Sequence, residues 1–118
     1  MYKKMALVLI AFSSVCQAEN ALLVGEWQCK LDSKYMKADQ VLTVNDDMTY
    51  RLVSRMLGAE LEDIGRWELK GKKLILEREF HIKRGRKKAS SQTFKHKIKK
   101  LDKNSLILKS KNTTTCSR

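Results

Sequence analysis

Two histidines are the side chains in this sequence that could most readily bind a metal ion or transfer a proton at neutral pH. His81 and His96 lie in segments of alternating polar and apolar residues, which predict neighbouring strands. A short turn that pairs Phe80 with His96 would place the two imidazoles on opposite faces of the sheet. They would then be unable to share a metal ion, and we expect no metal site.

Other groups with catalytic chemistry lack the partners that would activate them. Glu77 and Glu79 flank Arg78, and we expect them to pair with lysines on neighbouring strands rather than to act as an acid and a base. Ser90 and Ser91 have no base beside them in the expected strand arrangement. The sequence therefore predicts a non-enzymatic protein with no catalytic residues and no cofactor.

The N-terminus has the composition of an export signal. Two lysines precede an apolar run over residues 5–12, and Ala18 provides a small residue suited to signal-peptidase cleavage. The run is too short to span a bilayer. We expect a signal peptide over residues 1–18 and a periplasmic or secreted domain over residues 19–118. A lipoprotein acylated on Cys16 is the alternative.

Removal of that signal leaves two cysteines, Cys29 and Cys116, one near each end of the mature chain. An even pair of cysteines in an exported domain predicts a disulfide. Two unpaired, buried thiols are the alternative. A disulfide between these positions would join the beginning of the domain to its end.

Segments of alternating polarity, separated by turn residues at short and regular intervals, run through the mature chain. Residues 50–56 and 94–99 alternate most regularly, and Gly, Asn and Asp lie between such segments. Eight short antiparallel strands can form a sandwich, or they can close into an up-and-down barrel that has no exposed edge. The expected strands lie near residues 25–31, 39–45, 48–57, 62–69, 73–83, 91–101, 104–110 and 113–118.

The two ends of the domain favour closure. Trp27 and Cys29 share a face of the first expected strand, and Cys116 and Arg118 share a face of the last. An antiparallel pair with Cys29 opposite Cys116 also places Trp27 opposite Arg118, so that the guanidinium can stack on the indole. An ordinary core tryptophan and a frayed terminal arginine are the alternative. The sequence thus predicts an all-β, eight-stranded antiparallel up-and-down barrel.

Several motifs resemble those of a known superfamily. They are Gly25-Glu26-Trp27, the Asp-rich turn over residues 45–50, Gly65-Arg66-Trp67 and the segment 71–74. The chain resembles the lipocalin and calycin superfamily, and within it the small bacterial lipocalin-like domain proteins. That resemblance implies a barrel whose Gly-x-Trp motif packs against a late arginine at the closed end. The long helix that follows the lipocalin barrel is missing here.

The expected barrel interior is apolar and partly aromatic. An eight-stranded barrel is either filled by its own side chains or holds one small ligand, and at this length we expect a filled or narrowly open core. Arg78 falls on the inward face, where it could anchor a ligand carboxylate, unless a bulge turns it outward. The residues expected to face the interior and to bind a ligand are Leu42, Val44, Tyr50, Leu52, Met56, Trp67, Leu69, Leu76, Arg78, Phe80, Phe94 and Ile98.

Charge divides the mature chain into two halves. Residues 19–69 carry 6 basic and 10 acidic side chains, whereas residues 70–118 carry 17 basic and 3 acidic ones. A basic ridge of this kind attracts anions, and a solvated face is the alternative. No aromatic residue interleaves the tip of the basic hairpin, which argues against a single-stranded nucleic acid as partner. The candidate anion-binding residues are Lys83, Arg84, Arg86, Lys87 and Lys88 on a hairpin, and Lys95, Lys97 and Lys99 on the following strand.

These patterns predict an exported binding module, with two competing functions. The first is a carrier or sensor of a small apolar or amphiphilic ligand held inside the barrel. The second is a surface-interaction protein, such as an envelope adaptor, inhibitor or immunity-type protein, whose basic hairpin binds an acidic protein or an anionic envelope component. An apolar void open at one end would favour the first, and a fully packed interior would favour the second. We expect no specific nucleic-acid partner and no transmembrane span.

Overall fold

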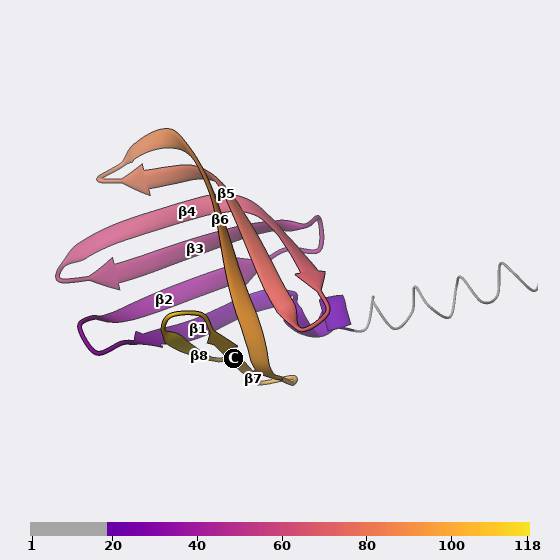
Figure 1. Cartoon of the computed structure of the whole chain (residues 1–118). Coiled ribbons are helices and arrows are strands. Elements are labelled where there is room, and N and C mark those ends of the chain that lie inside the picture. Colours follow the sequence, from indigo (N-terminus) through magenta and orange to yellow (C-terminus); the bar gives the residue numbers. More distant parts are fainter. Residues whose placement is uncertain (1–18) are drawn as a thin grey trace, which may run out of the picture.

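The computed structural model describes residues 19–118, which form eight antiparallel strands closed into a barrel (Figure 1). Each strand pairs with the next along the chain, and β8 pairs with β1. The predicted all-β up-and-down barrel is confirmed, whereas the expected signal peptide lies outside the described residues. The strands are β1 (Gly25–Asp32), β2 (Lys37–Val44), β3 (Thr49–Met56), β4 (Ala59–Lys70), β5 (Lys73–Lys83), β6 (Arg86–Leu101), β7 (Ser105–Lys109) and β8 (Thr113–Ser117).

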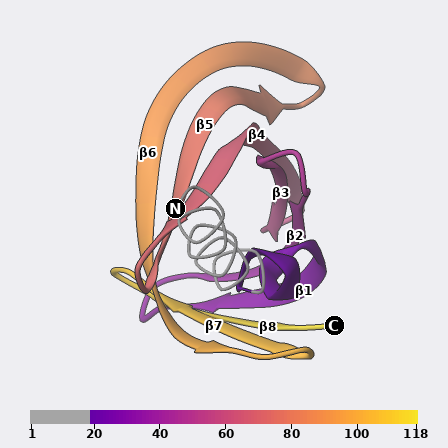
Figure 2. The ribbon, with the colours of Figure 1, turned by 90° about the vertical axis from the view of Figure 1, so that its right-hand side faces the viewer.

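The up-and-down order places successive turns at alternate ends of the barrel. Residues 19–23 are helical and lie at the end where β1 begins, which we call the helix end. Figure 2 views the molecule from this end and shows β5 and β6 arching away from the other strands. We call the opposite end the rim, and its four turns are residues 33–36, 57–58, 84–85 and 110–112.

β6 is longer than expected, because β5 and β6 continue to a two-residue turn. Lys83 pairs with Arg86 across Arg84 and Gly85, both of which have positive φ. Such a turn follows the twist of the strands and allows hydrogen bonding to continue to the tip. The strand expected to begin near residue 91 therefore begins at Arg86.

The helix end is sealed around Trp27, which is fully buried. Its Nε1 donates a hydrogen bond to the carbonyl of Leu23 at 2.9 Å, and the Arg118 guanidinium lies 3.9 Å from the ring centroid. Arg118 also donates hydrogen bonds to the carbonyls of Leu22 and Val24. The predicted contact between Trp27 and Arg118 is confirmed, and it ties the last residue of the barrel to the segment that enters the first strand.

Gly25 leaves room for that arginine. Its φ is 138°, and a Cβ at this position would lie 2.8 Å from Nη1 of Arg118. The Gly25 to Trp27 motif thus combines a bare backbone position with the aromatic ring on which the guanidinium stacks.

The predicted disulfide is confirmed. Cys29 and Cys116 are paired residues of β1 and β8, both are buried, and their sulfurs are bonded. The bond therefore lies across the seam that closes the barrel, and it suggests an extracytoplasmic location for the protein. Within residues 19–118, no helix is both long enough and apolar enough to cross a membrane.

An irregularity in β5 reverses the facing of its second half. Ile64 pairs with Phe80 and Gly65 pairs with Arg78, so Glu79 is an extra residue in β5. Side chains alternate between the two faces of a strand, and one extra residue changes the phase of that alternation.

Phe80 therefore lies on the outer face, where the Nζ of Lys87 is 4.2 Å from its ring centroid. The prediction that Phe80 faces the interior is wrong. Arg78 precedes the bulge and keeps its inward position, so the bulge does not turn it outward as the alternative had it.

The bulge requires a glycine at position 65. A Cβ on Gly65 would lie 1.9 Å from the carbonyl oxygen of Glu77, and this obstacle is backbone rather than a movable side chain. We therefore expect Gly65→Ala to lower the free energy of unfolding by about 1–3 kcal/mol, measured by urea denaturation. Gly58→Ala provides the comparison: nothing lies within 4 Å of the added Cβ, so the strain of a positive φ is its main cost, and the loss should be smaller. An equal or smaller loss for Gly65→Ala would contradict the close approach of β4 and β5.

Candidate functional site

A cavity of about 320 Å³ lies inside the barrel. Leu42, Leu52, Leu76, Phe94 and Leu108 form much of its apolar wall. The cavity extends toward the rim, where its lining includes residues from the first and last rim turns. A larger hollow of about 530 Å³ lies on the outer wall of β1, β2, β3 and β8, but exposed charged side chains border it.

Ten of the twelve expected interior residues divide between this cavity and a packed core, whereas Phe80 faces outward and Arg78 faces inward without being part of the cavity lining. Val44, Trp67, Leu69 and Ile98 pack in the core toward the helix end, where Nε1 of Trp67 donates a hydrogen bond to the carbonyl of Asn45 at 2.8 Å. The barrel is therefore filled at the helix end and hollow toward the rim. The expected residues that line the cavity are Leu42, Tyr50, Leu52, Met56, Leu76 and Phe94.

Polar side chains occupy part of the cavity wall. Nε2 of Gln40 donates a hydrogen bond to Oγ of Ser54 at 3.0 Å, and Asp63 and His96 also line the cavity. Burial lowers the pKa of His96, so its imidazole is neutral at physiological pH. None of these four was among the residues proposed from the sequence. The inward position of two of them could have been predicted from alternation. Asp63 is four residues from the inward Trp67, and His96 is two residues from the inward Phe94.

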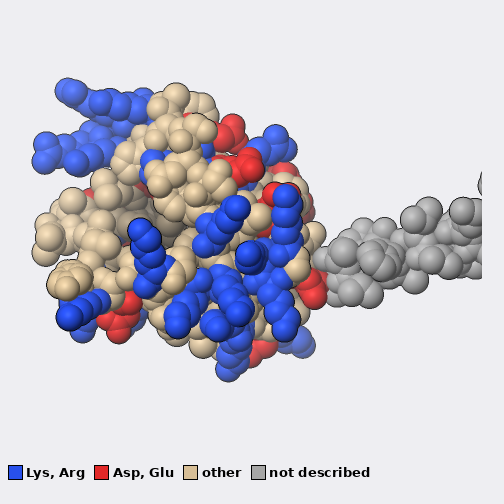
Figure 3. Space-filling view, in the orientation of Figure 1, with Lys and Arg blue, Asp and Glu red and all other residues tan. Residues whose placement is uncertain are grey.

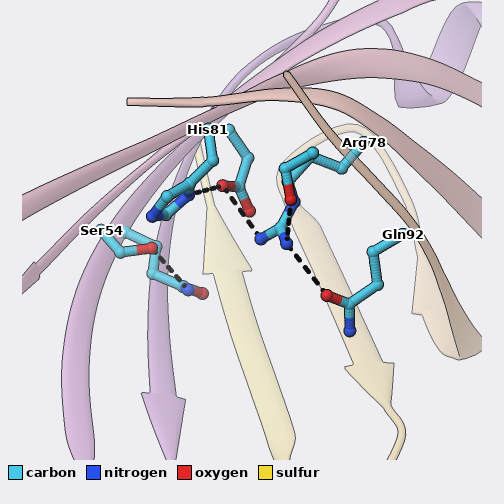
Figure 4. Close-up of polar contacts among 7 residues, drawn as sticks. Ser54, Arg78, His81 and Gln92 are labelled. Atoms are coloured by element: carbon cyan, nitrogen blue, oxygen red, sulfur yellow. Dashed lines mark hydrogen bonds and ion pairs between the residues drawn. The ribbon is translucent and has the colours of Figure 1, made fainter. Parts of the chain in front are cut away.

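Arg78 and Asp63 form a half-buried network on the wall made by β4, β5 and β6 (Figure 4). Oδ1 of Asp63 lies 3.5 Å from Nη1 of Arg78 and 2.6 Å from Nδ1 of His81. Nη2 of Arg78 donates hydrogen bonds to Oγ of Ser90 at 2.8 Å and to Oε1 of Gln92 at 2.9 Å. The positive charge of Arg78 is thus already opposed by a carboxylate of the same chain.

Two donors near this network have no acceptor. In residues 19–118, the hydroxyl of Tyr50 and Nε of Arg78 are the buried side-chain atoms without a hydrogen-bond partner. Burial, followed by the nearby charge of Asp63, raises the pKa of the Tyr50 hydroxyl, which therefore keeps its proton. An unpaired buried donor costs about 1–3 kcal/mol. Of the two residues, Tyr50 lines the cavity, so an acceptor oxygen on a bound molecule would satisfy its hydroxyl.

The two histidines lie on the same face, and the prediction that they point to opposite faces is wrong. Leu74, not Phe80, pairs with His96, and His81 pairs with Asp63 after the bulge. Both imidazoles therefore face inward. Among the described residues there is no group of three His, Cys, Asp or Glu side chains that could hold a metal ion.

Comparison with known protein families identifies the fold. A family model described as lipocalin-like matches residues 19–117. The chain belongs to the lipocalin-like family. No curated protein matches it. Proteins of this family are typically non-enzymatic binders. In this lipocalin-like protein, the feature consistent with binding is the cavity inside the barrel, whose wall is partly polar.

The outer surface of the lipocalin-like barrel carries two groups of cations (Figure 3). The first group extends from the tip of the β5–β6 hairpin at the rim, at the upper left of the figure, and all its members are exposed. We call it the hairpin cations; it comprises Lys83, Arg84, Arg86, Lys87 and Lys88.

The second group follows the outer wall of β6. Lys95 and Lys97 are exposed, and the charges of Lys97 and Lys109 lower the pKa of Lys99. This crowding of like charges indicates a strongly positive wall. The structure thus places both groups where the sequence suggested, while their binding of anions stays a prediction.

Proposed function

We propose that this lipocalin-like protein is an extracytoplasmic carrier or sensor, periplasmic or secreted, of a small amphiphilic molecule. The observation that carries the proposal is an apolar cavity whose lining includes a buried donor without an acceptor, the hydroxyl of Tyr50. The apolar part of a ligand would pack on Leu42, Leu52 and Phe94, and an acceptor oxygen of the ligand would accept a hydrogen bond from Tyr50.

The charge near this donor favours a neutral head group. Asp63 also lines the cavity, and its charge acts on the Tyr50 hydroxyl, so a second carboxylate brought to the same place would repel the first. A hydroxyl, ester or carbonyl oxygen accepts a hydrogen bond without that repulsion. The cavity is at the small end of the range for ligand sites, which is about 300–1,000 Å³. We therefore infer a short alcohol, ester or related amphiphile rather than a long-chain acid.

Titration followed by NMR chemical shifts tests this proposal, with 1-decanol and decanoate as probes. We expect shifts in cavity residues with both probes and tighter binding of decanol. Leu52→Trp should fill the cavity and weaken decanol binding at least about tenfold, whereas Val53→Trp, on the outer face of the same strand, should leave it unchanged. Two results would overturn the proposal: decanol binding that is unchanged in Leu52→Trp, and no decanol binding by the parent protein.

Tyr50→Phe separates the role of the hydroxyl in binding from any role in folding. The hydroxyl has no partner within the described residues, so its removal should leave the melting temperature unchanged or raise it. Loss of one hydrogen bond to the ligand should weaken decanol binding by about 3–10-fold. Tyr35→Phe, at an exposed site on a rim turn, is the matched control. A lower melting temperature with unchanged binding would assign the hydroxyl to folding instead.

A further inference from the structure

The large hydrophobic side chains that are exposed in residues 19–118 all lie at the rim. Tyr35 and Met36, in the first rim turn, are 90% and 41% exposed, and Leu57, in the second, is fully exposed at 107%. Single exposed apolar residues are common on protein surfaces. Three on two turns at the same end of a barrel concentrate exposed apolar surface there, and exposed apolar surface of this kind marks interaction sites.

Two rim turns carry residues that their backbone conformation disfavours. Leu57 and Gly58 have φ values of 50° and 77°, and Arg84 and Gly85 have values of 53° and 75°. Each pair forms the two-residue turn of a hairpin, in which both positions have positive φ and Asn-Gly or Asp-Gly is preferred. A leucine and an arginine at these positions are strained and exposed, so neither helps the fold. A contact outside the barrel would account for both.

Cations lie at the same end of the barrel as the apolar turns. Lys34 precedes Tyr35, and its Nζ lies 5.7 Å from the centroid of that ring. Arg84 lies at the tip of the hairpin cations defined above. The acidic Glu60, beside the second rim turn, is paired with Arg55. The rim thus combines an exposed aromatic ring, two aliphatic side chains and a majority of positive charge.

We propose that the rim docks the protein on an anionic phospholipid bilayer. Leu57, Tyr35 and Met36 would enter the headgroup region, and the hairpin cations would bind lipid phosphates. Apolar and aromatic side chains beside basic ones are the composition that binds such an interface. An acidic protein or an anionic polymer would use the cations but has no need of the exposed leucine. This inference goes beyond the carrier function and does not require a ligand in the cavity.

Vesicle sedimentation tests the proposal with the disulfide-bonded protein. We expect binding to vesicles that contain phosphatidylglycerol, weakening as salt rises, and little binding to phosphatidylcholine alone. Arg84→Asn should weaken binding about fivefold, as expected for one cation near a charged surface. Leu57→Asn should weaken binding by a similar factor. Each change creates Asn-Gly, so the melting temperature should stay the same or rise.

Lys72→Asn is the matched control. Lys72 lies in the two-residue turn between β4 and β5, at the helix end, and the change removes the same charge as Arg84→Asn. It should alter binding by less than about twofold, because the helix end lies farther from the bilayer than a Debye length. Equal losses for Lys72→Asn and Arg84→Asn would show that only net charge matters and would overturn the proposal.

Two other results would also overturn it. Full binding by Leu57→Asn, with loss only in Arg84→Asn, would assign the rim to an acidic protein or polymer instead. An absence of binding to phosphatidylglycerol vesicles would exclude the bilayer altogether. The decanol titration of Leu57→Asn should match that of the parent protein, so that failure of docking is distinguished from failure of the carrier function.

Discussion

Reduction of the Cys29–Cys116 disulfide is expected to lower the free energy of unfolding by about 2–5 kcal/mol. The bond joins residues 87 apart in sequence, and cross-linking a loop of this length removes much of the conformational entropy of the unfolded chain. It also holds β8 against β1 across the closing seam of the barrel. For a domain of this size, each kcal/mol corresponds to about 4–8 °C in melting temperature.

The measurement is thermal unfolding followed by circular dichroism, with and without a reducing agent. The double variant Cys29→Ala, Cys116→Ala is the control, since it should melt at the lower temperature in both conditions. A melting temperature of the parent protein that does not change on reduction would contradict the contribution assigned to the bond.

Trp27→Ala should be the most damaging single substitution in the seal of the helix end, with an expected loss of about 3–5 kcal/mol in the free energy of unfolding. The indole is fully buried, its Nε1 donates to Leu23, and its face supports the guanidinium of Arg118. Stacking of the cation contributes about 0.5–2 kcal/mol of this loss. The remainder of the loss comes from the cavity that the indole would leave and from the carbonyl of Leu23, which would lose its hydrogen bond.

Urea denaturation of Trp27→Ala, Trp27→Phe and Arg118→Lys separates these contributions, with Tyr35→Ala as the control. Trp27→Phe keeps an aromatic face for Arg118 but removes the Nε1 donor, so its loss should lie between those of the parent protein and Trp27→Ala. Arg118→Lys keeps the charge but not the planar fork that reaches the carbonyls of Leu22 and Val24. A loss for Trp27→Ala no larger than that for Tyr35→Ala, at an exposed position, would contradict the seal.

The polar network beside the cavity was only partly foreseeable. Arg78 was placed inward by simple alternation from Leu74 and Leu76, and it does lie there. Its partners Asp63, Ser90 and Gln92 come from two other strands. Which side chains meet depends on the registers of β4, β5 and β6, and no local pattern in the sequence records those registers.

The sequence by itself determined the closed barrel and its seam. Alternating strands separated by regular turns predicted the eight-stranded barrel, and two cysteines determined one register from which the Trp27–Arg118 contact followed. These features depend on a period of two over short distances and on one covalent link, both of which are visible in the chain.

Only the tertiary structure decided which residues of the second half of β5 face the barrel interior. Glu79 is inserted where Gly65 lets β4 approach the carbonyl of Glu77, and beyond that point Phe80 turns outward and His81 turns inward. The alternation continues to look regular in the sequence, because the bulge arises from contact between two strands. Alternation from Leu74 therefore predicts the correct face of the sheet as far as Arg78 and the wrong face after it. One extra residue is half of the two-residue period, so it moves every later side chain to the opposite face.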